Sequence, residues 1–205
     1  MNNLILKKIY PRPPLNNYTN MAYDIEGLYS ITYPIEAKLI SINIIKILNN
    51  INNINTPYKY SIIDMSAGCG GNIISFCEYF HTVTGIENNI ERCQILKNNI
   101  ASYNYTNYNI ICDDSINFIN STQNIFDVYF IDPPWGGPAY KNNTNIELSM
   151  SGITLVEIIN MIPKNKLIVL KLPFNYNIST FNTFNLLFKM EIKNILILFL
   201  IKYII

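Results

Sequence analysis

Residues 131–138 read Ile-Asp-Pro-Pro-Trp-Gly-Gly-Pro, and they directly follow the run Phe-Asp-Val-Tyr-Phe at residues 126–130. The aromatic and β-branched residues of that run are typical of a short buried strand. Two prolines, which have no N–H to donate, then end the strand in a stiff loop, and two glycines favour a sharp turn. Ligands of open α/β sheets bind just beyond the carboxyl ends of strands. The segment therefore predicts a rigid rim that presents Asp132, the Pro133 carbonyl and the Trp135 indole.

Such a rim suits a planar ring that carries an exocyclic amine. The carboxylate and the prolyl carbonyl would accept the two amine hydrogens, and the indole would stack on the ring. The alternative is a proline-rich surface turn with a tryptophan that only packs.

Apolar runs alternate with helical patterns along the rest of the chain. We expect strands at residues 60–65, 82–87, 108–112, 126–130 and 166–172, with one or two more between 190 and 205. We expect helices at residues 34–48, 73–80, 88–101, 148–162 and 179–188. This alternation predicts an α/β fold with a doubly wound, mostly parallel sheet. Residues 1–30 are expected to form an N-terminal extension, and residues 31–205 a single domain.

Two of these segments carry more specific expectations. The helix that begins at Pro34 is expected to bury one apolar face, made of Ile35, Leu39, Ile42, Ile45 and Leu48. Residues 1–20 are expected to be an irregular arm. Its basic residues, Lys7, Lys8 and Arg12, are either solvated or in contact with phosphates.

Composition and charge restrict the class of protein. The chain has 205 residues, of which 49% are hydrophobic and 14% charged, which favours a folded globule. A net charge of +1 argues against a broad electrostatic grip on duplex nucleic acid and leaves a small nucleotide target open. Because His81 is the only histidine, a His-rich metal site is excluded and no metal is expected.

The cysteines and the ends of the chain indicate an intracellular protein. No Cys-x-x-Cys pair occurs, so we expect reduced thiols at all four cysteines, Cys69, Cys77, Cys93 and Cys112. Residues 1–10 hold no secretory signal, and residues 195–205 are too short for a membrane span and are expected to form a buried strand. We expect no membrane partner, and a nuclear or cytoplasmic location if the source is eukaryotic.

A glycine-rich turn, Ser-Ala-Gly-Cys-Gly-Gly-Asn at residues 66–72, follows the first strand. Gly68 and Gly70 match the first two glycines of a dinucleotide-binding turn, but Ile73 stands at the third position, which weakens hydride chemistry. Asp64 precedes the turn, and Glu87 ends the next strand about 20 residues on, where a carboxylate accepts both ribose hydroxyls. The pattern indicates a nucleoside without a pyrophosphate.

A third acidic position follows the next strand, at Asp113 or Asp114, where a carboxylate faces an adenine amine. Each acid alone is a common cap or turn residue. Acids at the ends of consecutive strands jointly describe a nucleoside pocket. Together with residues 132–135 they indicate S-adenosylmethionine beside a planar amine substrate.

Residues 64–72, Glu87, 112–114 and 132–138 resemble the class I methyltransferase pattern. More closely, the segments at 27–32, 69–72 and 133–138 are similar to the trimethylguanosine synthase family, and the last is the most specific. The likeness runs from about residue 26 to residue 175. It implies a seven-stranded Rossmann-like sheet, S-adenosylmethionine as cofactor, and methyl transfer to N2 of 7-methylguanosine in an RNA cap.

The resemblance and the strand ends together give candidate site residues. The cofactor-binding candidates are Thr32, Asp64, Ser66, Ala67, Gly68, Gly70, Asn72, Glu87, Asn88, Asp113, Asp114 and Asp132. The catalytic candidates are Asp132, Pro133 and Trp135. The substrate-binding candidates are Trp135, Gly136, Pro138, Tyr140 and Asn175, which would hold capped RNA or a 7-methylguanosine nucleotide.

The chain departs from the family at one place. The family often has an arginine in a Leu-Pro-Arg-Asn segment that reaches the cap phosphates, whereas Phe174 stands there in this chain. Two alternatives remain open: an amino-methyltransferase acting on adenine, cytosine or guanine of RNA or DNA, and an inactive cofactor-fold protein that serves as an RNA-binding subunit.

Overall fold

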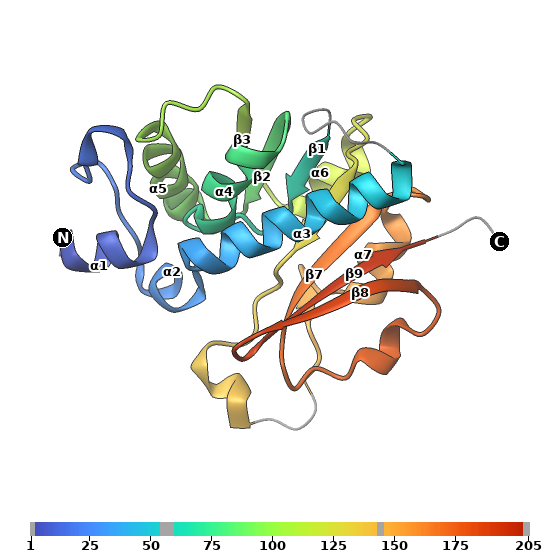
Figure 1. The fold of residues 1–205 in the computed structure, drawn as a ribbon. Coiled ribbons are helices and arrows are strands. Elements are labelled where there is room, and N and C mark those ends of the chain that lie inside the picture. Colours follow the sequence, from blue (N-terminus) through green and yellow to red (C-terminus); the bar gives the residue numbers. More distant parts are fainter. Residues whose placement is uncertain (1–2, 54–59, 143–145, 203–205) are drawn as a thin grey trace.

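Seven strands form one sheet through the middle of the protein (Figure 1), in the order β3-β2-β1-β4-β7-β9-β8. The computed structural model describes residues 3–53, 60–142 and 146–202. The strands are β1 (Ser61–Asp64), β2 (Thr82–Glu87), β3 (Tyr108–Cys112), β4 (Val128–Ile131), β7 (Leu167–Pro173), β8 (Asn185–Ile192) and β9 (Ile195–Ile201). The first five pair in parallel, and β9 runs antiparallel to both of its neighbours. The predicted doubly wound, mostly parallel sheet is confirmed.

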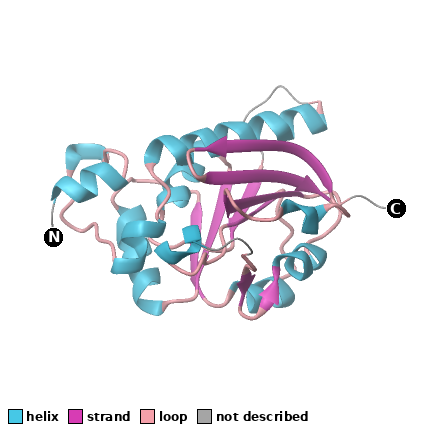
Figure 2. Cartoon of the chain, turned by 90° about the horizontal axis from the view of Figure 1, so that it is seen from below, coloured by secondary structure: helices cyan, strands magenta, loops and turns pink. Residues whose placement is uncertain are grey.

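The helices cover both faces of this sheet (Figure 2). They are α1 (Asn3–Ile9), α2 (Ile25–Ser30), α3 (Pro34–Asn52), α4 (Gly71–Tyr79), α5 (Ile90–Ala101), α6 (Ser115–Ser121) and α7 (Leu155–Met161), with single 3-10 turns at η1 (Pro14–Asn16), η2 (Pro138–Asn142) and η3 (Ile178–Phe181). The first core cluster joins α1, α3, α4 and α5 to one face, and the second joins α6 and α7 to the other. The central strands are buried on both faces, which explains why their sequences are continuous apolar runs.

The N-terminal residues do not form an irregular arm, so that prediction is wrong for Asn3–Ile9. These residues form α1, and Leu6, Ile9 and Tyr10 are almost completely buried in the first core cluster. The fully buried Asn99 of α5 donates to Tyr10 Oη (2.7 Å), Ala22 O (3.0 Å) and Cys69 O (2.9 Å). The N-terminal residues are therefore bonded to the glycine-rich turn through one asparagine.

Two predicted helices are wrong in part. Residues 148–162 begin with a small hairpin, β5 (Ser149–Met150) and β6 (Ile153–Thr154), before α7. Ser151 and Gly152 both have positive φ (52° and 78°), as a tight hairpin turn requires. Residues 179–188 hold only the end of η3 and the start of β8. Most residues of this edge strand are exposed, and its first four residues lack the alternation of apolar and polar residues that indicates a strand.

The predicted face of α3 is shifted around the helix. Ile35 is 76% exposed, whereas Ala37, Ile40 and Ile44 are fully buried against the sheet. Of the predicted face, Leu48 is buried and Leu39 is exposed. Isoleucines occur on both the buried and the exposed side of this helix, so the spacing of apolar residues alone did not identify the buried side.

The predicted strand at the carboxyl end of the chain is confirmed as β9, six of whose seven residues are buried. Residues 203–205, which that prediction included, lie outside the described part of the chain. Among the described residues no helix is both long and apolar enough to cross a bilayer.

Candidate active site

Three acidic side chains stand at the carboxyl ends of neighbouring strands. Asp64 ends β1, Glu87 ends β2 and Asp132 follows β4. Asp64 is completely buried, and its Oδ1 accepts from Ser66 N at 3.0 Å. Burial, with a smaller contribution from the charge of Asp132, raises the pKa of Asp64 to about 7. Its second oxygen, Oδ2, has no hydrogen-bond partner among the described residues.

The glycine-rich turn between β1 and α4 is packed tightly against Thr32. Gly70, the residue that caps the start of α4, has φ of 100°, a conformation that favours glycine. A Cβ added to Gly71 would lie 2.7 Å from the carbonyl oxygen of Thr32. Thr32 Oγ1 and Asn72 Oδ1 are buried and unpaired within the described chain. Buried polar atoms of this kind normally have partners, so the turn offers hydrogen-bonding groups to a ligand.

Glu87 holds this turn on the end of β2. Its Oε2 accepts from Gly68 N at 2.9 Å, and its Oε1 accepts from Asn89 N at 3.0 Å. Burial raises the pKa of Glu87, and these two N–H groups with Arg92 oppose the effect. Each carboxylate oxygen keeps a lone pair for a further donor.

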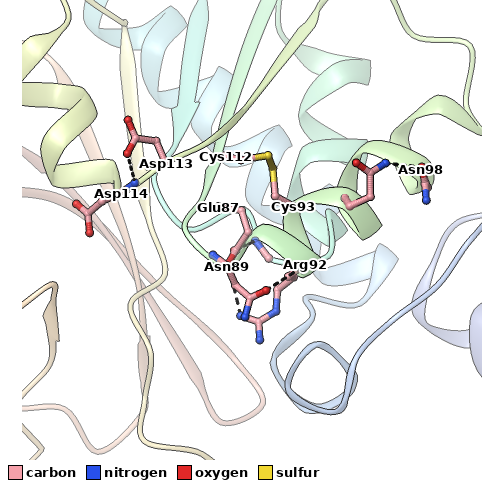
Figure 3. The surroundings of a disulfide bond; sticks show 10 residues. Glu87, Asn89, Arg92, Cys93, Asn98, Cys112, Asp113 and Asp114 are labelled. Carbon is pink, nitrogen blue, oxygen red and sulfur yellow. Dashed lines mark hydrogen bonds and ion pairs between the residues drawn. A yellow bond between two sulfur atoms is a disulfide. The ribbon is translucent and has the colours of Figure 1, made fainter.

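Arg92 is a site residue that sequence reasoning missed. Its Nε donates to Asp24 Oδ2 at 2.9 Å and its Nη2 to Glu26 Oε2 at 2.5 Å. Its Nη1 lies 3.6 Å from Glu87 Oε1, and Figure 3 shows Arg92 beside Glu87 and Asn89. The guanidinium thus joins the start of α2 to the acid of β2. Nothing in the local sequence signals a pairing between residues 68 positions apart.

A disulfide joins Cys93 of α5 to Cys112 at the end of β3 (Figure 3). The prediction of reduced thiols is therefore wrong for this pair. Cys112 is the register partner of Glu87 in the sheet, and Cys93 follows Arg92, so the disulfide borders the acidic strand ends. Cys69 and Cys77 are free and buried, and burial raises the pKa of each thiol to about 12.

The predicted acids after β3 differ in what they already bind. Asp114 caps α6, because its Oδ1 accepts from Ile116 N and Asn117 N at 2.8 and 3.1 Å, and its Oδ2 accepts from Ser151 Oγ. Asp113 is exposed, and within the described part of the chain it accepts a hydrogen bond only from Asp114 N, at 2.7 Å. Asn88 is exposed at the end of β2. Of the two acids, Asp113 is the one whose second oxygen has no hydrogen-bond partner among the described residues.

The rim after β4 is held to the glycine-rich turn, because Asp132 N donates to Ser66 Oγ at 2.8 Å. Lys171 Nζ donates to Asp132 Oδ2 at 2.5 Å and lies 5.3 Å from the ring centroid of Trp135. Burial raises the pKa of Asp132, and Lys171 and the Trp135 N–H oppose the effect. Lys171 was missed from the sequence, although a lone charge in an apolar strand was a usable signal.

The substrate-side candidates gather around the indole. The rings of Trp135 and Tyr140 meet edge to face with centroids 5.0 Å apart. Asn175 Nδ2 donates to Tyr140 O at 3.3 Å, which brings the end of β7 to η2. Gly136 has φ of 81°, so the predicted sharp turn is confirmed. The side chain of Pro138 lies outside the described part of the structure.

A glycine-rich turn after β1, acids at the ends of the next strands and this sheet order define a class I, Rossmann-like methyltransferase. A putative methyltransferase from Porphyromonas gingivalis W83 superposes with a TM-score of 0.67 at 13% identity, over 96% of this chain and 47% of that chain. A putative methyltransferase from Escherichia coli gives 0.53 at 16% identity, over 79% and 85%.

The chain belongs to the RNA cap guanine-N2 methyltransferase family, whose model matches residues 59–201. An uncharacterized protein of Acanthamoeba polyphaga mimivirus is 34% identical over 86% of this chain and 76% of its own length. The trimethylguanosine synthase of Schizosaccharomyces pombe is 28% identical over 71% of this chain and 65% of its own length. The alignment thus spans slightly less than two thirds of the yeast protein, and the resemblance seen in the sequence is confirmed at the level of the family.

Proposed function

We propose that this protein transfers a methyl group from S-adenosylmethionine to the exocyclic N2 of 7-methylguanosine in an RNA cap. The observation that carries the proposal is a rim on which Lys171 contacts both Asp132 and Trp135, and which Asp132 N bonds directly to Ser66 of the glycine-rich turn. Family membership supports the same substrate class.

The buried polar atoms around the turn fit the cofactor. Thr32 Oγ1, Asp64 Oδ2 and Asn72 Oδ1 are buried and unpaired in the described chain, and each can meet a polar group of the ligand. Glu87 would accept the ribose hydroxyls and Asp113 the adenine amine. Backbone groups of the turn, with Ser66, Ala67, Gly68, Gly70, Asn88 and Asp114, complete the proposed lining. When bound, S-adenosylmethionine supplies an electrophilic methyl group on a positively charged sulfur.

The rim would orient the nucleophile. Trp135 stacks on the methylated guanine, whose positive charge strengthens contact with the indole face. Asp132 and the Pro133 carbonyl accept the hydrogens of N2 and direct its lone pair, so that the rate comes mainly from alignment. Asp132 also takes the proton that N2 loses. Gly136, Pro138, Tyr140 and Asn175 form the walls on the substrate side.

Phosphate contact is proposed for the N-terminal lysines and arginine. Phe174, at the position where the family has arginine, is 54% exposed and has no charge. Lys7, Lys8 and Arg12 are exposed, and Lys8 Nζ lies 5.8 Å from the Tyr33 ring centroid. We also propose that residues 1–30 act as an extension that braces the cofactor side, because Asp24 and Glu26 bind Arg92.

Mass spectrometry of 7-methyl-GTP, GTP and adenosine-containing oligonucleotides after incubation with protein and S-adenosylmethionine tests this function. We expect one or more added methyl groups on 7-methyl-GTP and little on the other two. Methylation of the oligonucleotides instead would favour a general amino-methyltransferase. Absence of S-adenosylmethionine binding in calorimetry would favour an inactive RNA-binding subunit.

A further inference from the structure

Three ionisable side chains lie at the carboxyl ends of adjacent strands in the middle of the sheet. Asp64 ends β1, Asp132 follows β4 and Lys171 lies in β7, and β4 is the neighbour of both other strands. Along their strands they alternate with the residues that face the second core cluster, so all three share the face covered by α3 and α4. The cluster therefore holds two carboxylates and one ammonium group in a mostly apolar region.

Burial of the charged Lys171 side chain at this position costs free energy. Its side chain is 4% exposed in a strand whose seven residues are all buried, and a charge in such surroundings needs a partner. An apolar residue of similar size would serve packing at least as well, because buried ion pairs seldom add stability over well-packed apolar groups. A lysine at this position is therefore better explained by its electrostatic effect on the side chains that it contacts.

The neighbours of Lys171 are the two side chains assigned to the substrate amine and ring. Its Nζ binds Asp132 Oδ2 at 2.5 Å and lies 5.3 Å from the Trp135 ring centroid. One cation thus fixes the carboxylate relative to the indole. Asp132 Oδ2 accepts from Lys171, and Oδ1 has lone pairs that a donor on the substrate can use.

We propose that Lys171 is a positioning residue, which keeps Asp132 ionised and aims its second oxygen at the amine that stacks beside Trp135. This inference rests on the proposed function, since it concerns the same site. Loss of the Asp132 charge would also leave the ammonium of Lys171 unpaired near the stacking ring. The unpaired ammonium group of Lys171 would then repel a cationic base more than a neutral one.

The charged groups that face Asp132 come from both neighbouring strands. Burial disfavours the ionised carboxylate of Asp132, and Lys171 of β7 favours it. The charge of Asp132 in turn raises the pKa of Asp64 of β1, which is already raised by burial. Without Lys171, two buried carboxylates would share a region without a cation, and one of them would hold a proton near neutral pH.

The protein contains a matched control for this ion pair. Lys166 binds Asp127 at 3.3 Å, just before β7 and β4, so this pair lies at the amino ends of the same two strands. In both pairs the lysine and the aspartate are 39 residues apart in sequence. Lys166→Met therefore removes a more exposed lysine–aspartate pair without touching the site.

The first experiment is the pH profile of methylation of 7-methyl-GTP for the wild type, Lys171→Met, Lys171→Arg and Lys166→Met. For Lys171→Met we expect kcat at pH 7 to fall about tenfold or more and the acidic limb to move up by roughly one pH unit or more. Lys171→Arg should recover most of the rate, and Lys166→Met should match the wild type.

A second measurement needs no substrate. Trp135 is the only tryptophan of the chain, so its fluorescence reports the ionisation of Asp132 beside it. The midpoint of the emission titration should move up by roughly one unit or more in Lys171→Met and disappear in Asp132→Asn. The same titration of Asp64→Asn shows how much the ionisation of Asp64 contributes to the observed midpoint. If Lys171→Met folds poorly, the Lys171→Met/Asp132→Asn double variant should be the more stable of the two.

The outcomes separate the two proposals. A wild type that leaves 7-methyl-GTP unmethylated contradicts the proposed function, while the fluorescence titration still decides the role of Lys171. Unchanged midpoints and an unchanged pH profile in Lys171→Met would overturn the inference and leave the function standing.

Discussion

Arg92 Nη1 lies 3.6 Å from Glu87 Oε1, although Arg92 also binds two acids that belong to the N-terminal residues. Glu87 is buried, so its orientation depends on the few groups that contact it. Asp24, which caps α2, is one of the acids that hold Arg92, and the hydrogen bonds from Arg92 and Gly27 lower the pKa of Asp24 against the effect of burial. The N-terminal residues and the proposed cofactor site are thus coupled through one guanidinium group.

Glu87→Ala should weaken S-adenosylmethionine binding by about 2 kcal/mol or more, because two charge-assisted hydrogen bonds to the ribose are lost. Isothermal titration calorimetry measures the affinity, and Glu91→Ala, an exposed acid of α5, is the matched control. An unchanged affinity in a folded Glu87→Ala protein would place the ribose elsewhere.

Trp135→Ala should remove most methylation while cofactor affinity stays close to that of the wild type. Stacking contributes about 1–3 kcal/mol, and misalignment costs about a further hundredfold in rate. Single-turnover rates and calorimetry on the same preparation separate the two effects. Full activity on capped RNA would mean that the indole only packs against Tyr140.

Substrates with a 7-methylated guanine should react faster than unmethylated ones. A cation over an indole face gains about 0.5–2 kcal/mol, so we expect a preference of up to about thirtyfold from stacking alone. Initial rates on 7-methyl-GTP and GTP at two salt concentrations measure it. Equal rates, or a steep salt dependence with a preference for long RNA, would indicate a general amino-methyltransferase.

Reduction of the Cys93–Cys112 disulfide should lower the free energy of unfolding by about 3 kcal/mol, as expected for a closed loop of this length. Urea unfolding with and without dithiothreitol measures the change. The Cys112→Ser variant should unfold near the reduced wild type and show no response to the reductant. A response of that variant would trace the effect to some other group.

Asp64→Asn should stabilise the protein more at pH 8 than at pH 5. The pKa of Asp64 is raised to about 7 in the folded protein, so its contribution is most favourable below the ordinary aspartate pKa. That contribution is lost as the pH rises through about 7, and an amide does not titrate. Melting temperatures at the two pH values test this, and an equal shift at both would show that Asp64 titrates normally.

Patterns that extend over a few residues predicted most of the fold. The strand at Tyr108–Cys112 has the predicted bounds, and the acids at the strand ends lie where the parallel sheet predicts them. These features depend on neighbours in sequence: apolar runs, turn glycines and prolines. The prediction of one helix over residues 148–162 was wrong in part, because the two-residue turn at Ser151 and Gly152 was too short to interrupt the apolar pattern.

The missed parts of the site are contacts between distant residues. Arg92 meets Asp24, and Lys171 meets Asp132, only because the fold brings their elements together. The disulfide is a similar case, since Cys93 and Cys112 approach each other across α5 and β3. No periodicity or spacing rule encodes such pairs. Among these missed residues, Lys171 was the one that the local sequence could have indicated, because it is a charged residue within an apolar strand.

The position of β9 between β7 and β8 has a consequence for synthesis on the ribosome. Strands β1, β2, β3, β4 and β7 precede β9 in the chain, so each of them is translated before it. Until β9 pairs with it, β7 has unpaired backbone N–H and C=O groups along one apolar edge. Such an edge favours aggregation of an incomplete chain. The strand that carries Lys171 is therefore the last of the parallel strands to gain its second neighbour.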